Sequence, residues 1–135
     1  MVPAALQPGA TAESTYVVAA GDTAQALGSG ELSVLGTPRL LAWMEAVTCA
    51  ALAGSLAEGE TSVGTRMSIE HLKASAIGAT VAVSAELSHV DGRLTRFSVV
   101  AQDDDGAVVG HGQITRVVVD ERRFLSRIGA GPVLG

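Results

Sequence analysis

The segment from Thr37 to Leu56, TPRLLAWMEAVTCAALAGSL, constrains the fold more than any other part of the chain. Good helix formers dominate it, and Pro38 suits the first helical position, where its missing N–H costs nothing. Thr37 is a predicted N-cap, because its side-chain oxygen can accept a hydrogen bond from a free backbone N–H. The segment therefore predicts one long helix.

This predicted helix carries very little charge. A surface helix has a polar face, but the only charged residues here are Arg39 and Glu45. Polar interruptions argue against a membrane span, which needs about 20 apolar residues. We therefore expect a core helix that is buried nearly all round. Because an unpaired buried carboxylate is costly, Glu45 is predicted either to have a partner or to act in catalysis. The simpler interpretation is that its side chain reaches a sheet edge, a subunit contact or solvent.

The rest of the chain is rich in β-structure. Alternating apolar and polar residues after residue 62 indicate strands, and Asp91-Gly92 and Asp105-Gly106 are hairpin signals. Gly110 and Gly112 suggest a bulge or a close backbone approach within a strand. Predicted strands cover residues 14–19, 62–75, 79–90, 93–103 and 107–120, a short helix covers 121–127, residues 1–12 form a loose arm, and 21–36 form a loop.

One strand, one long helix and four antiparallel strands define an α+β chain. A helix apolar nearly all round, beside a sheet large enough to curl about it, indicates the hotdog fold. In that fold a curved antiparallel sheet of about five strands wraps a long central helix. We expect residues 1–135 to form a single hotdog domain.

Composition excludes several classes of function. A net charge of −5 argues against binding to the phosphate backbone of a nucleic acid. Cys49 is the one cysteine of the sequence, which excludes an internal disulfide and a cysteine-based zinc site. Cys49 is interpreted as a small core residue. Three widely spaced histidines argue against a metal site. The N-terminus lacks the features of a signal peptide, so we expect a cytoplasmic protein without a membrane partner.

Four sequence features together resemble a known family. These are T-P-x-L-x-x-x-M-E from Thr37 to Glu45, S-V-G-T from Ser62 to Thr65, a histidine at His71, and G-x-T-V-x-V-x-A-E-L from Gly78 to Leu87. This set is similar to the fluoroacetyl-CoA thioesterase-like branch of the hotdog superfamily, over roughly residues 14–125.

The resemblance implies hydrolysis of an acyl-CoA thioester. The Thr–Glu–His set of the family matches Thr37, Glu45 and His71, and the glycine whose N–H faces the thioester carbonyl matches Gly64. Glu45 is then the nucleophile or general base, His71 a proton-transfer residue and Thr37 a hydrogen-bonding orienter. Coenzyme A enters only as part of the substrate, and no other cofactor is expected. Exposed sheet edges and the family both imply a homodimer, joined edge to edge, with active sites at the interface.

One departure from the family concerns the acyl group. Members specific for the fluorinated substrate resemble one another in a phenylalanine-bearing lid before the helix, whereas this chain has Leu32 and Val34 there. We therefore expect Leu32 and Val34 to contact a different, small or medium acyl group. Arg116 is one candidate for binding the substrate among several cationic residues.

Two other functions stay open at this stage. The first is a non-catalytic protein of the same fold that binds acyl-CoA or another small ligand, since fold does not fix function. The second is a hotdog hydratase or dehydratase. Such enzymes resemble one another in an Asp/His pair at the start of the helix region, and Thr37-Pro38 departs from that pattern.

Overall fold

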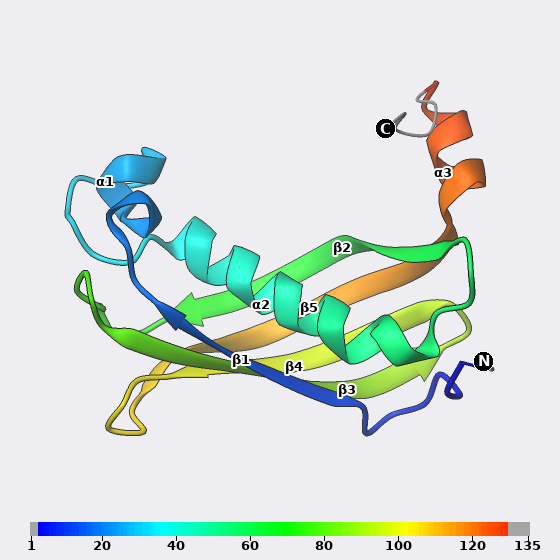
Figure 1. The fold of residues 1–135 in the computed structure, drawn as a ribbon, viewed down its shortest axis with the longest axis horizontal. Coiled ribbons are helices and arrows are strands. Elements are labelled where there is room, and N and C mark those ends of the chain that lie inside the picture. Colours follow the sequence, from blue (N-terminus) through cyan, green and yellow to red (C-terminus); the bar gives the residue numbers. More distant parts are fainter. Residues whose placement is uncertain (1–2, 130–135) are drawn as a thin grey trace.

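The computed structural model describes residues 3–129, which form a five-stranded antiparallel sheet crossed by one long helix (Figure 1). The strand order is β1-β3-β4-β5-β2, so β1 and β2 are the edges. The elements are β1 (Thr11–Val17), α1 (Ala24–Leu27), α2 (Thr37–Leu52), β2 (Glu60–His71), β3 (Thr80–Asp91), β4 (Leu94–Gln102), β5 (Val108–Asp120) and α3 (Glu121–Arg127), with 3₁₀ turns at Ala20–Asp22 and Ala53–Ser55. The predicted hotdog arrangement is confirmed.

The helix α2 packs one face against the sheet (Figure 1). Its side chains Leu40, Met44 and Leu52 are fully buried, and each such burial stabilises the fold by about 1.5–3 kcal/mol. Trp43 stacks on Tyr16 of β1, with ring centroids 4.5 Å apart and planes 4° from parallel. These contacts fix the helix relative to the sheet, and so fix the groups that the two elements carry.

The other face of α2 is exposed in the single chain. It presents small side chains, among them Ala42, Ala46, Cys49 and Ala50. The expectation of burial all round therefore holds for one face only, because one sheet layer covers one side of a helix. Cys49, interpreted from the sequence as a core residue, is instead exposed on this outer face.

The start of α2 differs from the prediction. Gly36 is the N-cap, in an extended conformation, and its carbonyl accepts from the N–H of Leu40 at 3.1 Å. Thr37 is the first residue of the helix, and its side chain caps nothing. The prediction of Thr37 as N-cap is wrong because the capping position falls one residue earlier, and this leaves the threonine hydroxyl free for another partner.

The N-terminal third also contains more structure than expected. Strand β1 begins at Thr11 rather than at residue 14, and the preceding arm is held by backbone hydrogen bonds from Ala4 to Gly54 and from Gly9 to Leu87, both 2.8 Å. The predicted loop of residues 21–36 contains the short helix α1, whose N-cap Thr23 accepts from the N–H of Ala26. No helix within residues 3–129 is long and apolar enough to cross a membrane.

Candidate active site

A β-bulge in β2 brings Gly64 and His71 to the same side of the sheet. Residues seven apart in a regular strand face opposite sides. In this strand the register with β5 shifts between Gly64 and Arg66, and Thr65 is the extra residue. Gly64 then pairs with Arg116, and His71 pairs with Gly110, six residues apart on β5. Both β2 residues therefore face α2.

The close approach of the paired strands β2 and β5 near His71 depends on a glycine. A Cβ at Gly110 would lie 2.7 Å from the backbone oxygen of Glu70, a distance that side chains do not adopt. The sequence prediction of a close backbone approach at this glycine is therefore confirmed. The tight contact positions the C-terminal end of β2, where His71 lies, against the rest of the sheet.

The hydroxyl of Thr37 is hydrogen-bonded to His71. The Oγ1 and Nδ1 atoms are 2.8 Å apart, and they join the first residue of α2 to the last residue of β2. The Nε2 atom is buried and has no hydrogen-bond partner among residues 3–129. Burial lowers the pKa of His71 below its ordinary value of 6.5. The imidazole is therefore neutral at pH 7, with one nitrogen able to accept a proton.

A cavity of about 270 Å³ lies beside this pair. Val34, from the segment predicted to contact the acyl group, is part of its wall, whereas Leu32 is 69% exposed and does not line it. Lys73 also lines the cavity and forms an ion pair with Asp103. The complete lining is Ala24, Ser29, Val34, Leu35, Thr37, His71, Leu72, Lys73 and Ala74. The wall therefore combines small apolar side chains with the Thr37–His71 pair.

Glu45 has a buried arginine as its partner. Its Oε2 atom accepts a hydrogen bond from Nη1 of Arg116 at 3.2 Å. Arg116 is only 6% exposed, and Ser62 holds it through Oγ at 2.9 Å and through the carbonyl oxygen at 3.1 Å. The carboxylate is thereby oriented while its side chain stays 34% exposed. Glu45 therefore has a partner within the chain, and Arg116, a candidate for substrate binding from the sequence, is buried in this contact.

Gly64 lies directly beside the carboxylate. A Cβ at this position would lie 2.9 Å from Oε2 of Glu45 and would also meet the methyl group of Met67. Because glycine has no Cβ, it leaves room for the Glu45 carboxylate against β2. Glu45, Gly64 and Arg116 form one compact group, which we call the carboxylate group. Ser62 begins the S-V-G-T motif, but no local pattern in the sequence indicates that it binds Arg116.

Within one chain the carboxylate group is separate from the Thr37–His71 pair. Thr37 and Glu45 are eight residues apart on α2, which is about 12 Å at 1.5 Å per residue. His71 faces the helix, and its hydrogen bond there is to Thr37. One chain therefore holds two half-sites: a threonine–histidine pair at a cavity, and an arginine-held carboxylate beside a glycine.

Comparison with known proteins agrees with this fold. A hot-dog-like protein from Thermanaerovibrio acidaminovorans superposes with a TM-score of 0.83 at 25% identity, over 92% of this chain and 91% of that one. A mutant of the fluoroacetyl-CoA-specific thioesterase FlK, crystallised with fluoroacetate and CoA, matches with a TM-score of 0.82 at 30% identity, over 88% of this chain and 99% of that one. The class of protein is thus a hotdog-fold thioester hydrolase.

The family itself follows from the sequence match. The profile of the family described as FlK, fluoroacetyl-CoA-specific thioesterase, matches residues 18–122. The fluoroacetyl-CoA thioesterase of Streptantibioticus cattleyicolor is 34% identical over 95 residues, which are 70% of this chain and 68% of that protein. The chain belongs to this FlK family. Both half-sites lie inside the matched range.

Proposed function

We propose that this chain hydrolyses the thioester of a small or medium acyl-CoA. The observation that carries the proposal is the hydrogen bond between His71 and Thr37 beside a cavity, on the fold of a thioesterase family. Thioester hydrolysis needs a base for the attacking group, a proton carrier and donors for the developing oxyanion. The two half-sites contain a candidate for each task.

Each residue has a definite part in the proposed reaction. In one route Glu45 takes a proton from water as the water oxygen attacks the carbonyl carbon. In the other route the Glu45 carboxylate attacks that carbon, and water then hydrolyses the resulting mixed anhydride to free the acid and the carboxylate. In both routes the backbone N–H of Gly64 donates to the oxyanion, the C–S bond breaks to release the CoA thiolate, and His71 returns the proton lost by water to that thiolate. Thr37 orients the imidazole through the bond to Nδ1.

The lining of the cavity suggests the character of the acyl group. Its apolar wall, including Val34 and Leu35, suits a hydrocarbon chain. The segment of residues 32–35 has no aromatic side chain. We therefore propose a non-fluorinated acyl-CoA, although fluoroacetyl-CoA is the substrate in the name of the S. cattleyicolor relative.

The working enzyme in this proposal is a homodimer. Strand β2 is a 12-residue edge with no strand on its outer side in the described chain, and natural proteins rarely leave such an edge unpaired. Pairing two copies of β2 about a twofold axis makes them antiparallel. The His71 end of one copy then lies beside the Gly64 end of the other. Light scattering at micromolar concentration should give a dimer, and a monomer would contradict this.

This pairing accounts for the two half-sites. Groups that act on one carbonyl must lie within about 3 Å of the reacting atoms, whereas Thr37 and Glu45 of one chain are separated by about 12 Å along α2. In the dimer, the Thr37–His71 pair of one protomer faces the carboxylate group of its partner. We therefore propose two composite active sites, each built from both protomers.

The direct test is release of free thiol from a panel of acyl-CoA thioesters. The panel runs from acetyl to decanoyl and includes aromatic and halogenated acyl groups. The wild type should release thiol from at least one member, and His71→Ala should abolish the release. A folded dimer that binds acyl-CoA saturably without releasing thiol would instead be a binding protein. Hydration of an enoyl-CoA, followed by absorbance, would identify a hydratase.

The substitution Gly64→Ala should lower hydrolysis by about tenfold or more while the protein still folds. The new Cβ would lie 2.9 Å from Oε2 of Glu45, so the carboxylate must move from its position on Arg116. Overpacking costs about 1–3 kcal/mol of stability. Gly54→Ala is the matched control, because a Cβ at Gly54 meets nothing within 4 Å. Equal activity of the two variants would contradict the placement of Gly64 in the site.

The pH profile of kcat/KM should show an acid limb with an apparent pKa below 6.5. Burial lowers the pKa of His71, so the neutral, proton-accepting form persists to lower pH than for an exposed histidine, and activity falls once the ring is protonated. Steady-state kinetics from pH 4.5 to 8 would locate the limb, and NMR of the His71 ring would assign it. A limb centred above 6.5 would contradict this assignment.

A further inference from the structure

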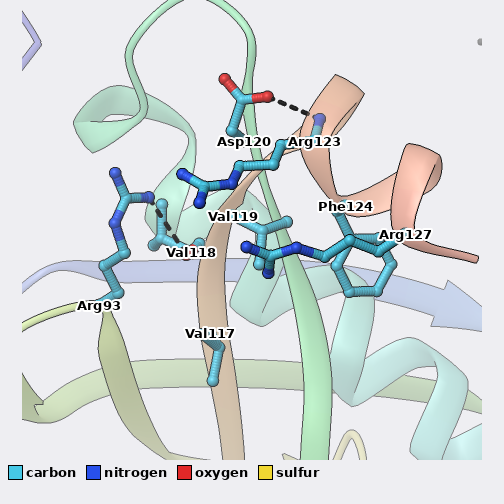
Figure 2. A pocket seen from close by; sticks show the side chains of 8 residues that line it. All are labelled: Arg93, Val117, Val118, Val119, Asp120, Arg123, Phe124 and Arg127. Atoms are coloured by element: carbon cyan, nitrogen blue, oxygen red, sulfur yellow. Dashed lines mark hydrogen bonds between the residues drawn. The ribbon is translucent and has the colours of Figure 1, made fainter.

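A second cavity lies between α3 and the sheet, on the side away from α2 (Figure 2). Its volume is about 350 Å³. Val117 and Val119 alternate along β5 with the inward-facing Arg116 and Val118, so they face away from α2 and form the floor. The cavity is therefore distinct from the one beside His71. The rest of the lining comes from Arg93, Val118, Asp120, Arg123, Phe124 and Arg127.

The side chains of α3 give this cavity positive charge and an aromatic surface. Arg123 and Arg127 are four residues apart, so they project from the same side of the helix. Figure 2 shows both guanidinium groups extending over the cavity, with the ring of Phe124 next to Arg127. The helix is held in this position because Asp120 caps it by accepting from the N–H of Arg123 at 2.9 Å.

The arginines at this cavity differ in their ion pairing, and one carboxylate, that of Asp120, lines the cavity with them. Arg93, which also lines the cavity, forms an ion pair with Glu60 at 3.2 Å. Arg123 and Arg127 form no ion pair within residues 3–129. The α3 cavity therefore carries two guanidinium groups that have no ion pair among the described residues, in a chain with a net charge of −5.

From these observations we propose that this cavity binds a phosphorylated nucleoside. Guanidinium groups bind phosphate through paired, charge-assisted hydrogen bonds, and an aromatic ring stacks on a base. Arg123 and Arg127 hold the phosphates in this assignment, and Phe124 contacts the base. The cavity volume lies within the range of small-molecule sites. Because the family match ends at residue 122, these three residues lie outside it.

A neighbouring cavity supports the choice by contrast. It is lined by Arg66, Arg96 and polar side chains and has about the same size, 370 Å³, but it contains no aromatic residue. It therefore offers phosphate contacts without a surface for a base. The α3 cavity, by contrast, has Phe124 beside Arg123 and Arg127.

The bound nucleotide has two possible sources with the same chemistry. It is either the 3′-phosphorylated ADP end of the acyl-CoA substrate, in which case the inference rests on the proposed function, or a free nucleotide bound apart from the active site. The first source requires the pantetheine arm to pass from one side of the sheet to the other around the sheet edge or the dimer. Comparing the kinetics of acyl-CoA with those of the corresponding acyl-pantetheine distinguishes the two sources.

Direct binding tests the site itself without reference to hydrolysis. Isothermal titration of the full chain with adenosine 3′,5′-bisphosphate should show saturable binding that weakens with added salt. Arg123→Gln with Arg127→Gln should weaken it by about tenfold or more, and Phe124→Leu should also weaken it. Arg96→Gln with Arg122→Gln removes the same charge elsewhere and should not. Absence of saturable binding, or equal loss in the charge-matched control, would overturn the proposal.

Kinetics then assign the source. If the substrate supplies the nucleotide, Arg123→Gln with Arg127→Gln raises KM for acyl-CoA but leaves kinetics with the corresponding acyl-pantetheine unchanged. If the nucleotide is a separate molecule, both substrates keep their KM while bisphosphate binding is still lost. A chain that binds the bisphosphate but hydrolyses neither thioester would refute the proposed hydrolysis and leave the nucleotide site intact.

Discussion

Glu45→Gln should lose most thioester hydrolysis, by about 10²- to 10⁴-fold, while keeping the fold and the dimer. The glutamine amide has nearly the same shape as the carboxylate, and its oxygen can still accept from Nη1 of Arg116, which now lies 3.2 Å from Oε2 of Glu45. The amide, however, takes no proton from water and is a poor nucleophile. The loss should therefore appear in kcat rather than in KM.

The control for this prediction is Glu58→Gln, which removes the same charge from an exposed position after α2. It should retain wild-type turnover. Circular dichroism and thermal unfolding of both variants separate a chemical effect from a folding defect. If Glu45→Gln turned over acyl-CoA at a rate close to that of the wild type, Glu45 would be only the structural partner of Arg116, and its proposed role in the reaction would be wrong.

The sequence predicts those parts of the fold that depend on local patterns. The α2 segment has strong helix formers and a proline near its start, and strands β3 to β5 show regular alternation with Asp-Gly turns between them. These signals act over a few residues, so they can be read without the tertiary structure. The fold class and the positions of β3, β4 and β5 follow from them closely, whereas β2 ends at His71 rather than at residue 75 and β1 begins three residues early.

The contacts of the site depend on residues far apart in the chain, and local patterns do not contain them. Thr37 and His71 are 34 residues apart, and Glu45 and Arg116 are 71 apart. The bulge at Thr65 is equally invisible, because simple alternation places Gly64 and His71 on opposite faces. The resemblance to the family supplied these residues, whereas the structure supplied their partners and the division into two half-sites.

Mixed dimers should recover activity that neither parent has. In an isolated heterodimer of Glu45→Gln and His71→Ala, one composite site combines His71 of the first protomer with Glu45 of its partner, and both residues are native. The other site carries both substitutions. The heterodimer should therefore show about half the wild-type activity per dimer, whereas each homodimeric variant has two damaged sites. Two affinity tags allow the heterodimer to be isolated, and thiol release measures its turnover.

The reverse combination gives the matched control. A heterodimer of the wild type with the double variant Glu45→Gln, His71→Ala contains the same set of substitutions, distributed differently. If each site is composite, both sites in this dimer have one substituted residue, and activity should be lost. If each site lies within one protomer, this dimer keeps one native site and the first heterodimer keeps none. The two heterodimers thus give opposite results under the two arrangements. Activity in the first heterodimer alone would show that His71 of one protomer acts with Glu45 of its partner, as the separation of roughly 12 Å between Thr37 and Glu45 along α2 requires.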